Sequence, residues 1–158
     1  MMKIGSALGG GLAGALSLTL LHEVARRVLP SAPRLDVLGM RALAKSLSAL
    51  EQPVPDRNRL HNMALVGDLL SNTVYYSLVG TGEGAHARRR GVLLGLAAGI
   101  GAVVLPGPLG LGRGPSRCTV ATHMMTIGWY LAGGLIAGVV AESLSEPGYL
   151  QPTGTRHG

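Results

Sequence analysis

The apolar residues of this chain gather in four blocks, at about residues 4–21, 59–80, 91–106 and 120–141. An α-helix rises about 1.5 Å per residue, so about 20 apolar residues cross the roughly 30 Å hydrocarbon core of a bilayer. Polar segments rich in proline and glycine separate the blocks, and only 14 % of the 158 residues are charged. We therefore predict an all-α integral membrane protein: a four-helix transmembrane bundle that forms one domain over residues 1–144, followed by a flexible tail at 145–158.

A shorter segment between the first two blocks, residues 36–51, has the pattern of an amphipathic helix. Its apolar residues recur at helical spacing on one face: Met40, Leu43, Leu47 and Leu50. Arg41 and Lys45 fall on the opposite face. The segment is too short to span a bilayer. We expect it to lie in the headgroup plane or to cover the cytoplasmic end of the bundle.

Glycines recur four residues apart in three of the four blocks. Small residues at this spacing let a neighbouring helix approach closely inside a membrane, where hydrophobicity gives no driving force for association. The glycines predicted to pack helices are Gly10, Gly14, Gly91, Gly95, Gly99, Gly134 and Gly138. They could serve helices of this chain, a second copy or a partner membrane protein.

The second block carries a polar stripe across its apolar surface. Successive residues placed 100° apart put His61, Asp68, Asn72 and Tyr75 on one side of the helix. A similar stripe in the fourth block contains His123 and Tyr130, so we expect these two helices to be partners.

The sharpest signal in this candidate intramembrane polar site is Asp68. An ionised carboxylate in hydrocarbon either pairs with a cation or takes up a proton, and His61, Asn72 and His123 are the partners that the spacing allows. The stripe could therefore carry a proton, a cation or a polar substrate. The alternative is a buried polar network that only fixes the register of the helices.

The pair His22-Glu23 closes the first block. No small-x-small cleavage site precedes it, so we expect an uncleaved first span rather than a signal peptide. A zincin motif would need a second histidine at position 26, where this chain has Arg26. We expect Glu23 to pair with Arg26 or Arg27, and we predict no metal site, cofactor or catalytic residue.

The net charge of +6 comes largely from basic residues beside the apolar blocks. We predict that they contact anionic lipid headgroups rather than nucleic acid. The predicted headgroup residues are Arg26, Arg27, Arg41, Lys45, Arg88, Arg89 and Arg90. Nine basic residues flank the side of the first and third loops and five flank the other, which favours the first loop in the cytoplasm. The Arg88–Arg90 triplet in a short loop opposes that orientation.

The composition is typical of a small, multi-pass bacterial inner-membrane protein. We expect foremost a structural, assembly or partner-binding protein, acting as a homo-oligomer or with a partner membrane protein through its glycine-rich faces. One alternative is a small proton- or cation-coupled transporter that uses the stripe around Asp68. A second is a lipid-headgroup-modifying enzyme that holds phosphate with its arginines and uses His22, Glu23 or Asp68 as acid or base.

Overall fold

The computed structural model describes residues 3–30, 32–112 and 119–145, and these residues form helices and connecting segments with no strand. The prediction of an all-helical protein is confirmed for them. The predicted tail, apart from Ser145, and Cys118 lie outside the described residues. Five α-helices follow one another along the chain: α1 (Ile4–Val28), α2 (Leu35–Ala49), α3 (Arg57–Ser77), α4 (Ala87–Val104) and α5 (Val120–Ser143). Two short 3-10 turns, η1 (Leu78–Gly80) and η2 (Gly84–His86), join α3 to α4.

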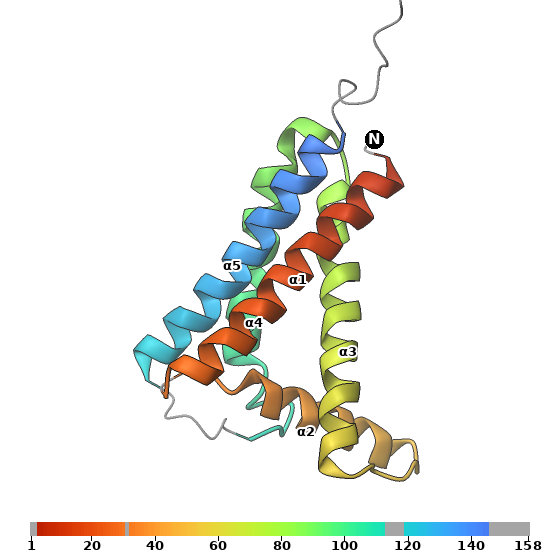
Figure 1. The fold of residues 1–158 in the computed structure, drawn as a ribbon, viewed down its shortest axis with the longest axis vertical. Helices are drawn as coiled ribbons and strands as arrows, with labels where there is room; N and C mark the ends of the chain where they lie inside the picture. Colours follow the sequence, from red (N-terminus) through yellow and green to blue (C-terminus); the bar gives the residue numbers. More distant parts are fainter. Residues whose placement is uncertain (1–2, 31, 113–118, 146–158) are drawn as a thin grey trace, which may run out of the picture.

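The four long helices run side by side, and α2 crosses one end of the bundle (Figure 1). The main neighbours of α5 are α4 and α1, whereas α3 packs chiefly against α1 and α2. The second and fourth apolar blocks, expected to be partners, meet only in part. Tyr76 of α3 donates to the carbonyl oxygen of Tyr130 on α5 at 2.8 Å, but the main neighbour of both helices is α1 or α4, with α1 packing against both of them.

The contacts of α5 with α4 and α1 are close because glycines lie in them. A Cβ added to Gly95 of α4 would lie 2.6 Å from the carbonyl oxygen of Tyr130, and one added to Gly14 of α1 would lie 2.6 Å from that of Gly133. The remaining predicted glycines lie in the same two contacts: Gly10 on α1, Gly91 and Gly99 on α4, and Gly134 and Gly138 on α5. The backbones of α1 and α4 therefore contact the backbone of α5 directly.

Large aliphatic side chains cover the outside of the bundle, and small ones fill its inside. The buried positions include Ala15, Ala87, Ala137 and Ala141, and the largest fully buried side chains are Tyr76, Leu18 and Val79. Exposed positions on all four long helices hold leucine, isoleucine and valine: Leu12, Leu16, Val66, Leu70, Val74, Leu93, Ile100, Val120 and Leu135. A water-soluble domain has the opposite distribution, with its large aliphatic side chains inside.

Two of the described helices, α1 and α5, are long and apolar enough to cross a membrane. The other two long helices, α3 and α4, are less apolar, for different reasons. Polar residues are spread along α3, including Arg57, Arg59 and Asp68, and α4 begins with three arginines within its 18 residues. The structure thus has two candidate membrane-spanning helices, where the sequence predicts four.

The observed α1 runs past the predicted end of the first block. It continues to Val28, because Glu23 accepts a hydrogen bond from Arg26 Nε at 2.7 Å within the helix and proline first occurs at position 30. The predicted pairing of Glu23 with Arg26 is confirmed, and Arg27 lies 3.4 Å from the same carboxylate. This last part of α1 brings polar side chains to the end of the bundle where α2 lies.

The short helix α2 is tied to the segment that follows α4. Met40 is buried, Leu43 and Leu47 are half-buried, and Leu50 lies beyond the helix and is exposed. On the other face, Arg41 donates to the carbonyl oxygen of Leu111 at 3.1 Å and Lys45 to that of Leu109 at 2.6 Å. The apolar face is therefore shorter than predicted, and the basic face bonds to the chain itself.

The glycine contacts make a direct prediction for stability. Gly95→Ala should lower the free energy of unfolding by about 1–3 kcal/mol, because its Cβ would overlap the α5 backbone. Gly128→Ala is the matched control, since Gly128 of α5 has no atom within 4 Å of the added Cβ. The control should be neutral or stabilising by up to about 1 kcal/mol, owing to the higher helix propensity of alanine. Unfolding in detergent, followed by circular dichroism, measures both, and equal effects would contradict the packing.

Candidate functional site

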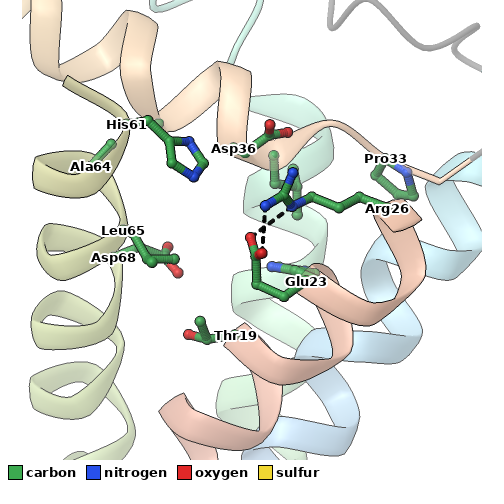
Figure 2. A pocket seen from close by; sticks show the side chains of 12 residues that line it. Thr19, Glu23, Arg26, Pro33, Asp36, His61, Ala64, Leu65 and Asp68 are labelled. Atoms are coloured by element: carbon green, nitrogen blue, oxygen red, sulfur yellow. Dashed lines mark hydrogen bonds and ion pairs between the residues drawn. The ribbon is translucent and has the colours of Figure 1, made fainter. Parts of the chain in front are cut away.

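A small polar cavity of about 50 Å³ lies among α1, α2 and α3, at the end of the bundle that α2 crosses. Figure 2 shows Thr19, Glu23 and Arg26 reaching it from α1, Asp36 from α2, and His61 and Asp68 from α3. His22 also lines it. The volume is enough for a few water molecules or one small ion.

Asp68 and His61 face this cavity together because they are seven residues, or about two turns, apart on α3. Asp68 Oδ1 accepts a hydrogen bond from Asn72 Nδ2 at 3.0 Å. Within the described part of the chain, the Asp68 carboxylate forms no ion pair. Of the expected partners of Asp68, Asn72 donates a hydrogen bond to it and His61 lines the same cavity.

The other two carboxylates of the cavity are each matched by an arginine. Glu23 is held by Arg26, and the two oxygens of Asp36 accept from Nε and Nη2 of Arg34 at 3.0 Å each. Arg27 lies 3.4 Å from Glu23 as well, so three arginines stand near the three carboxyls of this region. Asp68 is nevertheless the one carboxyl lining the cavity that no basic side chain of the described chain pairs with.

The contact between Asp36 and Arg34 shifts the pKa of both groups. Burial acts to raise the pKa of Asp36, but the hydrogen bonds and charge of Arg34 outweigh it, and the net pKa lies below its usual range. The same hydrogen bonds raise the pKa of Arg34. Asp36 therefore stays ionised in the folded protein at neutral pH.

Thr19 was not among the residues predicted for a polar site, and His22 was considered only as an acid or base of a lipid-modifying enzyme. The ring centroid of His22 lies 5.1 Å from that of Trp129 and 5.9 Å from that of Tyr130, and its Nε2 is buried with no hydrogen-bond partner among the described residues. The spacing of Thr19, Glu23 and Arg26 by four and three residues could have revealed this face. This face was not predicted because the first helix was expected to end at residue 21.

Three residues of the predicted stripe do not join Asp68 at the cavity. Tyr75 donates to the carbonyl oxygen of Leu94 on α4 at 2.9 Å, and Tyr130 uses its own carbonyl to accept from Tyr76 at 2.8 Å. His123 lines a separate pocket among α2, α4 and α5. The expected partnership of His123 with Asp68 is wrong, because α1 separates the two helices that carry them.

Most of the predicted headgroup residues contact the chain itself. At the end opposite α2, Arg88 pairs with Glu142 at 2.9 Å, and Arg90 donates to the carbonyl oxygens of Val79 and Glu83 at 2.8 and 2.6 Å. Arg89 is exposed. Arginines and lysine therefore fasten helix ends and loops at both ends of the bundle.

No three of the described histidine, cysteine, aspartate and glutamate side chains are close enough together to hold a metal ion. No protein-family model, curated protein or solved structure matches this chain. The chemistry of the site must therefore be argued from its own residues.

The pair of Asp36 and Arg34 predicts how stability depends on pH. A carboxyl whose pKa is depressed by folding stabilises the protein above its unfolded pKa of about 3.9, and this contribution is lost as pH falls through the folded pKa. Asp36→Asn should therefore reduce stability at pH 7 and remove part of the loss seen in acid.

The expected size of this effect is at most about 1 kcal/mol, because the Arg34 side chain is 40 % exposed and water screens the pair. Thermal unfolding of wild type, Asp36→Asn, Arg34→Gln and the double variant between pH 3 and 7 measures it. The two single variants should lose similar stability and the double variant little more. If the double variant loses as much stability as the two single variants together, the ion pair does not contribute to stability.

Proposed function

We propose that this protein crosses a membrane with all four long helices, and that its cavity binds a proton or a small monovalent cation as part of a proton- or cation-coupled permeation unit. The observation that carries the proposal is Asp68, a carboxyl that lines the cavity without pairing with any basic side chain of the described chain, inside a bundle whose outer surface is aliphatic. An ionisable residue at such a place is costly to keep, and it is a typical feature of ion pathways.

The aliphatic outer surface supports a membrane position for α3 and α4 as well as for α1 and α5. On α3, Val66, Leu70 and Val74 are 56, 62 and 69 % exposed, while Asn72 and Tyr76 on the opposite side are buried. An apolar surface on every long helix would be unfavourable in water and is favourable in lipid. α3 then has a low mean hydropathy because its inner face and its first turns carry polar residues, and not because the helix lies in water.

The distribution of basic residues supports an orientation with α2 on the cytoplasmic side. The described basic residues at the α2 end are Arg26, Arg27, Arg34, Arg41, Lys45, Arg57 and Arg59, and those at the other end are Lys3, Arg88, Arg89 and Arg90. Positive residues are enriched on the cytoplasmic side of membrane proteins. The cavity would then lie near the cytoplasmic surface.

The glycine faces give less support to a partner-binding role. The glycines that were predicted to pack helices are occupied by helices of the same chain, as with Gly95 against Tyr130 and Gly14 against Gly133. Each of these seven glycines therefore supports the packing of this bundle. A bound proton or cation would account for a cavity-lining aspartate that no basic side chain of the described chain pairs with, whereas a polar network that only fixes helix register is the alternative that the flux experiment below tests.

A topology experiment tests whether α3 crosses the membrane. In a Cys118→Ser background, single cysteines are placed by Gln52→Cys, before α3, and by Glu83→Cys, after it. A membrane-impermeant maleimide should label position 83 in intact cells and position 52 only after the membrane is opened. Labelling of both positions from the same side would contradict a four-span arrangement.

A flux experiment tests the role of Asp68. The purified protein is reconstituted into liposomes that contain a pH dye, and a potassium diffusion potential drives cations inward. The protein should then let protons, or the cation supplied outside, enter the liposomes. Asp68→Asn should reduce the flux to that of protein-free liposomes, because the amide keeps its hydrogen bonding but cannot titrate.

The matched control for the flux is Asp56→Asn, the same change at the exposed start of the same helix. Asp56 Oδ1 caps α3 by accepting from the backbone N–H of Asn58 and Arg59, and asparagine caps equally well. This variant should keep the wild-type flux. Wild-type flux in Asp68→Asn, or none in the wild type, would refute the proposed function.

A further inference from the structure

A second pocket opens beside the cavity at the same end of the bundle and is lined by arginines; Arg26, Asp36 and His61 line both spaces. It has a volume of about 400 Å³ and lies between the end of α1, the start of α2 and the first two turns of α3. Its donor side chains come from three separate segments: Arg26, Arg34, Arg57, Asn58, His61 and Asn62. We refer to it as the arginine pocket, and we propose that it binds a phosphate group.

The charge of the arginine pocket favours an anion. Arg26 and Arg34 are paired with Glu23 and Asp36, and Asp36 itself lines the pocket. Arg57 forms no ion pair or hydrogen bond through its side chain among the described residues, so it adds one net positive charge. A ligand with a single negative charge, such as a phosphodiester or dihydrogen phosphate, balances the pocket.

The kinds of donor present favour phosphate over a simpler anion. A guanidinium presents planar pairs of N–H groups that match two phosphate oxygens, and such charge-assisted bonds are the strong ones in proteins. The side-chain amides of Asn58 and Asn62, one turn apart on α3, offer further N–H donors on the same face. Three guanidinium groups from three segments can surround a tetrahedral anion, whereas a surface run on one helix cannot.

Two sources of phosphate fit this position. At the membrane interface that the proposed function assigns to α2, the phosphate of a phospholipid headgroup lies at the level of the arginine pocket. Free inorganic phosphate could also enter from the cytoplasm. The binding chemistry is the same in both cases and does not involve Asp68.

Binding to the full-length protein in detergent tests the inference with two probes, inorganic phosphate and short-chain phosphatidylglycerol, measured by calorimetry. Arg57→Gln should weaken binding about tenfold or more, since a hydrogen bond to a charged group contributes about 1.5–3 kcal/mol and 1.4 kcal/mol is tenfold. Arg59→Gln is the matched control, because Arg59 follows two residues later on α3 and does not line the pocket. It should change the affinity less than twofold.

The outcomes separate the sources and the alternatives. Binding of phosphate that competes with the lipid identifies free phosphate as a ligand, and binding of the lipid alone identifies the headgroup; both support the inference if Arg57→Gln weakens them. Equal effects of Arg57→Gln and Arg59→Gln, or no binding of either probe, would overturn it.

Asn62→Ala should also weaken binding by a few-fold, which gives a second variant at an exposed position. Asp68→Asn should leave it unchanged, so failure of the permeation proposal is seen separately.

Discussion

Contact between helix backbones through glycine determines the arrangement of this protein. Gly14 of α1 and Gly95 of α4 approach the α5 backbone so closely that a Cβ at either position would overlap a carbonyl oxygen. With α5 in contact with α4 and α1, α3 packs chiefly against another face of α1 and reaches α4 and α5 through the hydroxyls of Tyr75 and Tyr76. The resulting space between α1 and α3, closed at one end by α2, is where the polar cavity lies. The site is therefore a consequence of how the small residues pack.

Within that space, charge is distributed in a simple order from inside to outside. Asp68 lies deepest along α3 and has no cationic partner among the described residues, whereas Glu23 and Asp36 are each matched by an arginine. Farther out, Arg57 adds a positive charge that no carboxylate of the described chain balances. The two proposed sites, an inner one for a proton or cation and an outer one for a phosphate, adjoin each other, since Arg26, Asp36 and His61 line both. This arrangement connects the fold to both proposals.

The sequence was sufficient to predict the helices, the ion pair of Glu23 with Arg26, and the common face of His61 and Asp68, because each depends on spacing within one helix. It was not sufficient to predict which helices are neighbours. Glycine periodicity shows that a helix can be approached closely but does not identify the helix that approaches, and so His123 was wrongly paired with Asp68. The last part of α1 was not predicted to be helical because its charged residues were taken to end the helix. Two of these residues, Glu23 and Arg26, in fact pair with each other within the helix.

We expect the aliphatic faces of the long helices to face lipid and the polar face of α3 to face the inside of the bundle. Spin labels introduced one at a time along α3 in a reconstituted bilayer test it directly, through their accessibility to oxygen and to a water-soluble nickel complex. We expect high oxygen accessibility at Val66, Leu70 and Val74, with minima at Asn72 and Tyr76. High accessibility of Val66, Leu70 and Val74 to the nickel complex would place this face in water and contradict a membrane position for α3.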